Sequence, residues 1–274
     1  MLLSKAPPYL TKLQLNGTVW LAADIHLGPH SPKTAQAFYA FLRQARQQTD
    51  ALILCGDIFN AWVGADAALN PPGWLAQAIH HLRSTSQDLA LYLMRGNRDF
   101  LLDQQFARYV GAQLLDDQIL LCTPAQCLVL THGDELCTDD VSYQRFRQRV
   151  RQPWLQRLFL KLPLHWRQHI AGGLRSQSRK KQRYTPLNIS DVNTAYCGQL
   201  LAPHPTQLLV HGHTHRPAIH RLAIPGRADG TRVVLPDWEY DHSTPTRSGW
   251  LALLPDGHLS LHRLHQPTLR FKLN

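Results

Sequence analysis

Three histidines around one glycine form the densest group of potential ligands in the sequence. His211, His213 and His215 lie in the segment Val-His-Gly-His-Thr-His-Arg-Pro, directly after an apolar run that ends at Val210. Imidazole is a common ligand of transition metals, and two histidines two residues apart at a strand end can supply half of a site. The chain has 16 histidines, so a cluster of this kind also arises by chance. Carboxylates at matching positions elsewhere would favour a metal site over a chance cluster of histidines.

Such residues occur at the ends of four other apolar runs. Asp24 and His26 follow residues 19–23, Asp57 follows residues 51–56, Asn97 follows residues 89–94, and His132 follows residues 128–131. We expect each run to be a strand, and the carboxyl ends of strands are where open α/β sheets build their sites. The sequence therefore predicts that five strands bring oxygen and nitrogen ligands to one edge.

The candidate ligands are too many for one ion of four to six ligands. They are Asp24, His26, Asp57, Asn97, His132, His213 and His215. A carboxylate can bridge two ions, and Asp57 is the natural choice. Two cations about 3.5–4 Å apart orient a phosphate and supply a nucleophile at neutral pH. The mixed nitrogen and oxygen set favours Mn²⁺, Fe²⁺, Co²⁺ or Zn²⁺ over Mg²⁺ and Ca²⁺.

The elements that must position these ligands alternate between strands and helices. After the first three strands we expect helices near residues 34–49, 72–84 and 104–109, followed by short strands near 113–121 and 126–131. Between residues 140 and 201 we expect only helices, broken at Pro153, Pro163 and Pro186, with Ser190 capping the last one. The remainder, residues 207–264, is strand-rich. The pattern predicts an α/β fold with a helical insertion.

The charge of the chain is concentrated in that insertion. The formal net charge is +10, and residues 145–183 hold twelve Lys and Arg but no acidic residue. The charge indicates an anionic partner, either nucleic acid, a nucleotide or an acidic membrane surface. The same segment is rich in apolar residues, which suits a lipid anion or a membrane-surface helix. From the residues alone, packing of these apolar side chains on the sheet is the favoured alternative.

The cysteines and the apolar runs indicate in which cellular compartment the protein is expected. The five cysteines are an odd number without a Cys-x-x-Cys pair, which argues against a disulfide framework and for a reducing cytoplasm. No apolar run reaches the roughly 18 residues that a membrane span needs. Residues 1–17 lack an apolar stretch of signal-peptide length, so we expect no export.

The order of the ligand blocks resembles that of the calcineurin-like metallophosphoesterases. Across about 190 residues the sequence contains, in order, Asp24-x-His26, Gly56-Asp57, Gly96-Asn97, His132-Gly133-Asp134 and Gly212-His213-Thr214-His215. The resemblance implies an α/β/β/α sandwich of two packed sheets flanked by helices. It also implies two divalent metals, one bound by Asp24, His26, Asp57 and His215 and the other by Asp57, Asn97, His132 and His213. We expect His211 to pack or to make an outer hydrogen bond, and Asp99 and Asp134 to orient ligands.

The neighbouring residues are similar to those of the UDP-2,3-diacylglucosamine diphosphatases of lipid A biosynthesis. The similarity covers roughly residues 18–235 and rests on Gly-Asp-Ile-Phe-Asn-Ala-Trp at 56–62, Gly-Asn-Arg-Asp-Phe-Leu-Leu at 96–102, His-Gly-Asp-Glu-Leu-Cys-Thr-Asp-Asp at 132–140, and the segments 153–156, 191–193 and 213–217. It implies Mn²⁺-dependent attack of water on the α-phosphorus of the UDP-linked lipid, which releases UMP and diacylglucosamine 1-phosphate. It also implies a core of residues 18–139 and 202–274, a basic, apolar-rich helical cap of residues 140–201, and an N-terminal extension of residues 1–17.

The resemblance assigns roles to individual residues. The catalytic residues that it implies are Asp57, Asn97, Arg98 and His132. The residues that it implies in substrate binding are Asn97, Arg98, Asp140, Ser178 and His213. Two positions depart from the family, because its cap asparagine aligns with Gln182 and its cap lysine with Thr185. Lys181 or Arg183 are the possible substitutes for the missing charge. Arg98 is always charged and can bind a phosphate through two donors.

The resemblance also implies partners and a location. The substrate would be a lipid-linked UDP-sugar, and the protein a monomer in the cytoplasm, attached peripherally to the cytoplasmic face of the inner membrane, with no nucleic acid partner. One alternative is another dinuclear metallophosphoesterase that acts on soluble nucleotides or nucleic acid. A second is a scaffold that has lost catalysis, which bound metal would argue against.

Overall fold

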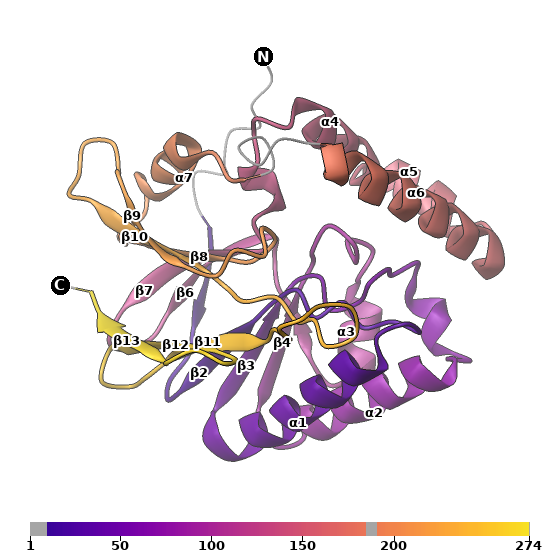
Figure 1. Ribbon diagram of the computed structural model, residues 1–274, viewed down its shortest axis with the longest axis horizontal. Helices are drawn as coiled ribbons and strands as arrows, with labels where there is room; N and C mark the ends of the chain where they lie inside the picture. Colours follow the sequence, from indigo (N-terminus) through magenta and orange to yellow (C-terminus); the bar gives the residue numbers. More distant parts are fainter. Residues whose placement is uncertain (1–9, 185–190, 274) are drawn as a thin grey trace.

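Two mixed β-sheets pack face to face in the computed structural model, and helices cover both outer faces (Figure 1). The structure describes residues 10–184 and 191–273, with the backbone alone for residues 176–184. The arrangement confirms the predicted α/β/β/α sandwich with a helical insertion.

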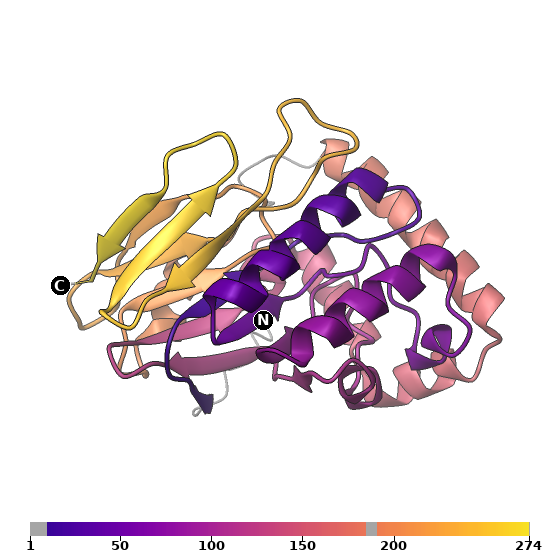
Figure 2. The ribbon, with the colours of Figure 1, turned by 90° about the horizontal axis from the view of Figure 1, so that it is seen from below.

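The first sheet has seven strands in the order β13-β12-β11-β2-β3-β4-β5. They are β2 (Val19–Ala22), β3 (Ala51–Cys55), β4 (Ala90–Met94), β5 (Gln113–Leu114), β11 (Gly249–Leu253), β12 (His258–Arg263) and β13 (Leu269–Lys272). The strands β2, β3 and β4 are parallel neighbours, so their carboxyl ends meet at one edge. Their outer face is covered by α1 (Pro32–Gln48), α2 (Gly73–Ser86) and α3 (Gln104–Tyr109) (Figure 2).

The second sheet has six strands in the order β1-β6-β7-β8-β10-β9. They are β1 (Thr11–Gln14), β6 (Gln118–Cys122), β7 (Cys127–Thr131), β8 (Leu208–His211), β9 (Ile219–Leu222) and β10 (Gly230–Val234). Because β7 and β8 are parallel neighbours, His132 and the three-histidine segment leave the sheet at the same edge. The outer face carries α7 (Thr194–Leu201), which Asn193 caps by accepting from the Tyr196 N–H. The predicted cap, Ser190, lies outside the described residues.

The core explains why the strands are continuous apolar runs. Side chains alternate along β2, so Leu21 points between the sheets while Trp20 and Ala22 point toward α1. Both faces of the central strands are therefore buried, and almost every strand position must be apolar.

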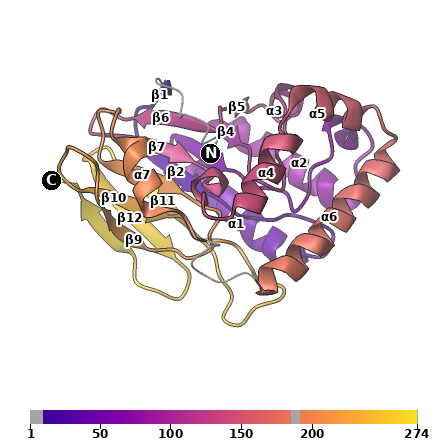
Figure 3. The ribbon, with the colours of Figure 1, turned by 90° about the horizontal axis from the view of Figure 1, so that it is seen from above.

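The insertion forms three helices that lie beside the carboxyl edge of the sheets (Figure 3). They are α4 (Val141–Val150), α5 (Pro153–Leu160) and α6 (Leu164–Tyr184), separated near Pro153 and Pro163 as predicted. Phe159 and Leu164 pack on the core. Most other large apolar side chains of these helices and the turn between them are exposed, namely Val141, Phe146, Trp154, Leu158, Leu160, Leu162, Trp166, Ile170 and Leu174. The alternative that these side chains pack on the sheet is therefore wrong for this set, which we call the exposed apolar set.

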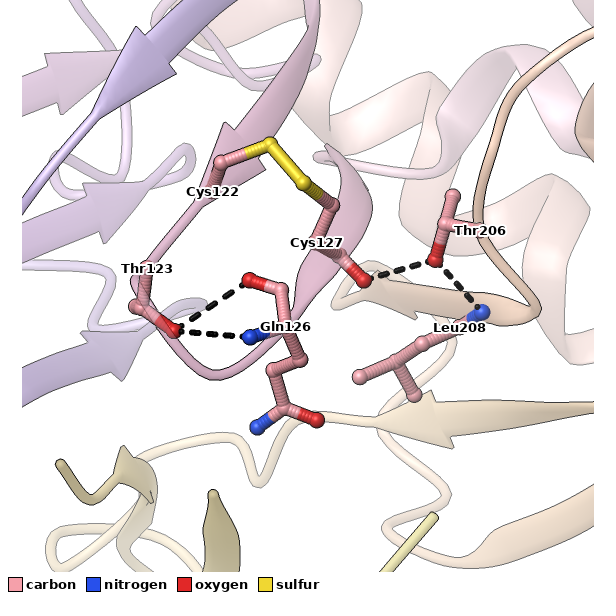
Figure 4. The surroundings of a disulfide bond; sticks show 6 residues. All are labelled: Cys122, Thr123, Gln126, Cys127, Thr206 and Leu208. Carbon is pink, nitrogen blue, oxygen red and sulfur yellow. Dashed lines mark hydrogen bonds between the residues drawn. A yellow bond between two sulfur atoms is a disulfide. The ribbon is translucent and has the colours of Figure 1, made fainter. Parts of the chain in front are cut away.

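Two expectations about the chain outside the insertion need correction. Part of the predicted N-terminal extension belongs to the second sheet, because β1 pairs with β6 over residues 11–14. A disulfide joins Cys122 to Cys127, although the cysteine pattern argued against one (Figure 4). These two cysteines are direct partners at the end of the β6–β7 hairpin, with Cα atoms 4.0 Å apart. The hairpin register thus creates a proximity that cysteine spacing does not reveal.

Within the described ranges, no helix is both long enough and apolar enough to pass through a bilayer.

Candidate metal centre

The predicted ligands converge where the two sheets meet at their carboxyl ends. Asp24, Asp57 and Asn97 follow β2, β3 and β4 of the first sheet, whereas His132 and the His213–His215 pair follow β7 and β8 of the second. Two carboxylates, those of Asp24 and Asp57, are almost completely buried. Burial of two carboxylates without a compensating cation is costly, so the arrangement itself calls for positive charge.

The backbone at these positions is unusual. In the part of the chain that the structure describes, six residues other than glycine have positive φ, and five of them are candidate ligands. Those five are Asp24, His26, Asp57, His213 and His215. A non-glycine residue in this region costs of order 1–3 kcal/mol, and such strain concentrates at functional sites. The fold therefore retains these conformations in order to direct the side chains.

Two glycines leave the space that the carboxylates occupy. A Cβ atom at Gly96 would collide with the Asp57 carboxylate, and one at Gly212 would collide with that of Asp24. This close approach explains why a glycine precedes both Asn97 and His213.

One group of ligand atoms forms around Asp24. Its Oδ1 lies 3.4 Å from His215 Nε2 and 4.0 Å from His26 Nε2. The two Nε2 atoms are 3.2 Å apart. Asp24, His26 and His215 can thus direct one atom each toward a single ion, and so can Asp24, Asp57 and His132.

Asp57 lies between the two halves of the site. Its Oδ2 is 3.7 Å from His26 Nδ1, and its Oδ1 is 3.7 Å from His132 Nε2. On the other side, Asn97 Oδ1 lies 3.1 Å from His132 Nε2 and 2.9 Å from His213 Nδ1. This is the position that a bridging carboxylate requires.

The hydrogen bonds of His132 test whether these residues fit a cation. Its Nδ1 lies 3.0 Å from the Cys55 carbonyl, which can only accept, so Nδ1 carries a proton. In a neutral ring Nε2 then presents a lone pair to the Asn97 oxygen, which is unfavourable unless a proton or a metal lies between them. Burial opposes a charged ring, but the carboxylates of Asp57 and Asp24 outweigh it and raise the pKa of His132 to about 9.

Two buried atoms point to the same conclusion. Asp24 Oδ1 and His26 Nδ1 have no hydrogen-bond partner among the described residues. Unpaired buried polar atoms are rare in folded proteins and indicate an ion or water that completes the site. The residues present therefore fit divalent cations with mixed nitrogen and oxygen ligands.

Asp99 and Asp134 hold the ligand loops, as the sequence predicted. The buried Asp99 carboxylate accepts from the backbone N–H groups of Gly96, Asp57, Ile58 and Phe59, and thereby joins the loops after β3 and β4. Asp134, at the start of the 3₁₀ helix η2 (Asp134–Leu136), accepts from Tyr143 Oη at 2.6 Å and Arg147 Nε at 2.7 Å. The first cap helix is thus tied to the loop that carries His132.

Arg98 lies at the open side of the site. Its backbone N–H donates to Asp57 Oδ1 at 2.8 Å, and its Nε lies 3.4 Å from Asp57 Oδ2. Its Nη1 donates to Asn60. The guanidinium is partly exposed and can face a bound anion.

The structure describes the predicted substrate-binding side chains less completely than the predicted metal ligands. Asp140 caps α4 by accepting from the Tyr143 N–H at 2.9 Å. Ser178, Lys181, Gln182 and Arg183 lie on α6, whose side chains the structure does not describe beyond residue 175, and Thr185 lies outside the described residues.

His211 lies apart from the ligand groups. Its Nδ1 donates to the Gly212 carbonyl at 2.8 Å, and its Nε2 accepts from Arg232 at 3.2 Å. Burial, followed by the charge of Arg232, lowers the pKa of His211 to about 3. The ring is therefore neutral and fully buried, which fits the predicted packing role, and its two hydrogen bonds go to residues that are not ligands.

Two residues near the site were missed in the sequence. The ring of Tyr143 stacks 6.2 Å from that of His213, and nothing in the local pattern indicated this contact. Asp237 Oδ2 lies 3.5 Å from His215 Nδ1. Asp237 comes shortly after β10, so the rule that found the other carboxylates could have found it.

A family model and several named proteins match most of the length of this chain. The family model of calcineurin-like phosphoesterases matches residues 17–217. A protein of Bordetella pertussis named UDP-2,3-diacylglucosamine hydrolase is 46% identical over 90% of this chain and 96% of its own. Proteins of the same name from Serratia proteamaculans and Vibrio cholerae are 41% and 37% identical, over 81% and 84% of this chain and 91% and 94% of theirs. Among solved structures, the phosphoesterase Yfce of E. coli aligns at 16% identity with a TM-score of 0.45, over 94% of this chain and 100% of that chain.

Proposed function

The chain belongs to the calcineurin-like phosphoesterases and to the family of the UDP-2,3-diacylglucosamine hydrolases, and we propose that it hydrolyses the pyrophosphate bond of UDP-2,3-diacylglucosamine. Water attacks the α-phosphorus, and the products are UMP and 2,3-diacylglucosamine 1-phosphate, in a step of lipid A biosynthesis. The observation that carries this proposal is the convergence of all seven predicted ligands at one edge, in a chain 46% identical to a protein of that name.

Two Mn²⁺ ions are the proposed cofactors. Asp24, His26, Asp57 and His215 would hold one, and Asp57, Asn97, His132 and His213 the other. When bound, such a pair orients the phosphate and makes water nucleophilic at neutral pH.

The residues of the chain would do the rest. Arg98, beside Asp57 and partly exposed, binds the phosphate oxygens and offsets the negative charge that develops on them. His132 keeps its proton on Nδ1 through the Cys55 carbonyl, so that Nε2 remains directed at the site. The site is complete within one chain, which supports a monomer.

Within the predicted cap of residues 140–201, the helices α4, α5 and α6 would act as the cap for the lipid, whereas α7 packs on the second sheet. Support comes from the exposed apolar set, which lies in the same segment as the exposed basic residues Arg145, Arg149, Arg157 and Lys161. Acyl chains would contact the apolar side chains, while the basic ones meet anionic head groups. Asp140, Ser178, Gln182, Thr185 and His213 are the proposed sugar and phosphate contacts, with Lys181 or Arg183 supplying the charge that Thr185 lacks.

The same surface would hold the protein at the cytoplasmic face of the inner membrane. Replacing Trp154 and Trp166 together with serine should reduce flotation with vesicles that contain anionic lipid. Leu269→Ser is the matched control, because Leu269 is also an exposed large apolar residue but lies on β13, outside the cap. Equal flotation of both variants would contradict the assignment of the membrane surface to the cap.

Hydrolysis of the lipid substrate tests the proposal directly. UMP release should require Mn²⁺, stop with EDTA, and be much faster than cleavage of a water-soluble phosphodiester. A preference for the soluble ester would be consistent with the metal centre but would contradict the lipid substrate. The basic helices would then bind a nucleotide or a nucleic acid instead.

A further inference from the structure

Asp237 lies in a segment that is joined to both sheets next to the site. The segment follows β10, and the Leu235 N–H donates to the His211 carbonyl at 2.7 Å. The Trp238 N–H donates to the Asp24 carbonyl at 3.0 Å. Asp237, between these two anchors, is only 2% exposed. Its position relative to the ligands is therefore fixed by backbone hydrogen bonds.

The ring of His215 faces Asp237 with the nitrogen that the ligand cluster does not use. Nε2 lies 3.2 Å from His26 Nε2 and 3.4 Å from Asp24 Oδ1, so this nitrogen is directed at the cluster. Nδ1 lies 3.5 Å from Asp237 Oδ2. A neutral imidazole that offers the Nε2 lone pair to a metal must carry its proton on Nδ1, which is the atom that faces the carboxylate.

Arg247 holds the Asp237 carboxylate from the other side. Its Nε lies 3.2 and 3.1 Å from the two carboxylate oxygens, and its Nη2 lies 2.9 Å from Oδ2. The backbone of Arg247 is paired with that of Glu239 through two hydrogen bonds of 2.9 Å. A planar guanidinium bound in this way fixes the plane of the carboxylate.

We infer that Asp237 is a positioning residue for the metal centre, which orients His215 and keeps its proton on Nδ1, and that Arg247 keeps Asp237 in place. This inference rests on the proposed binding of one ion by Asp24, His26, Asp57 and His215. Outer carboxylates of this kind alter metal affinity by about 10- to 100-fold when they are removed.

Calorimetric titration of the metal-free protein with Mn²⁺ tests the inference without the substrate. Asp237→Asn should weaken one ion by about 10- to 100-fold and leave the other unchanged. Arg247→Gln should weaken the same ion by a smaller factor. Because the Arg247 side chain is 44% exposed, this variant carries the test if Asp237→Asn does not fold, which circular dichroism of the metal-free proteins would reveal.

Asp241→Asn is the matched control. Asp241 lies in the same connection, but its carboxylate accepts from Lys33 and Thr34 at the start of α1 and contacts none of the ligands. It should leave both affinities unchanged. Excess Mn²⁺ should restore UMP release by Asp237→Asn, which a direct contact with substrate would not allow.

The outcomes separate this inference from the proposed function. Unchanged Mn²⁺ affinities in both Asp237→Asn and Arg247→Gln would overturn the role of Asp237 but would not contradict the metal centre. An equal loss in Asp241→Asn would also overturn it. A wild-type protein that binds no Mn²⁺ would overturn the metal centre itself and the inference with it.

Discussion

Adding metal back to the metal-free protein should raise its Tm, and the size of the increase should depend on how many ions bind. An ion that binds only the folded state stabilises it by roughly 2.7 kcal/mol when its free concentration is 100 times its Kd. For 274 residues the entropy of unfolding is about 0.6 kcal/mol/K near 60 °C. Two ions should therefore raise Tm by about 9 °C over the metal-free protein, and one ion by about 5 °C.

Scanning calorimetry with and without Mn²⁺ at that concentration distinguishes the two cases. Asp57→Asn removes the charge shared by both ligand sets. Addition of Mn²⁺ should therefore raise the Tm of this variant by at most about 5 °C. Asp103→Asn is the control, because Asp103 caps α3 and contacts no ligand. Because asparagine caps a helix about as well as aspartate, this variant should have nearly the wild-type Tm and the full response to Mn²⁺. A full response in Asp57→Asn, or a wild-type response near 5 °C at saturation, would refute the assignment of Asp57 as a bridge between two ions.

Three further predictions follow from the site. Arg98→Met should lower the rate of UMP release by about 10²- to 10³-fold and keep the Tm response to Mn²⁺, because the guanidinium acts on the phosphate and not on the metals; loss of that response would contradict this role. Because burial lowers the pKa of His211 to about 3 from 6.5, the unfolded chain takes up this proton first as the pH falls, so His211 by itself should remove about 2 kcal/mol of unfolding free energy between pH 7.5 and 5. Denaturant titrations at several pH values should show a smaller loss in His211→Asn. Cys55→Ala should cost about 1 kcal/mol of stability and leave kcat unchanged, since Cys55 contacts His132 only through its carbonyl; an inactive variant that folds and binds metal would exclude this account.

The positions of the ligands could be predicted because each depends on local sequence. An apolar run followed by a polar residue marks a strand end, and parallel strands bring their ends to the same edge. The same rule would have selected Asp237, which follows the apolar end of β10. However, Pro236-Asp237 is equally typical of an ordinary turn, so the local sequence does not distinguish a site residue from a turn residue.

Features that depend on strand register or on pairing between distant segments could not be predicted. The disulfide requires the exact register of β6 and β7, and β1 pairs with a strand more than 100 residues away. The apolar residues of α5 and α6 have a helical period, but a period does not say whether an apolar face is covered by protein. Only the three-dimensional arrangement shows that most of the cap face is exposed.

The short strand β1 has a consequence for shortened versions of the chain. It is the edge of the second sheet, and its polar residues Thr11, Lys12 and Gln14 cover the apolar strand β6. Without β1, the unpaired backbone groups of Ile119 to Leu121 would become the edge. An uncovered apolar edge pairs readily with another chain, so a protein that begins at residue 18 should self-associate although its metal centre is intact.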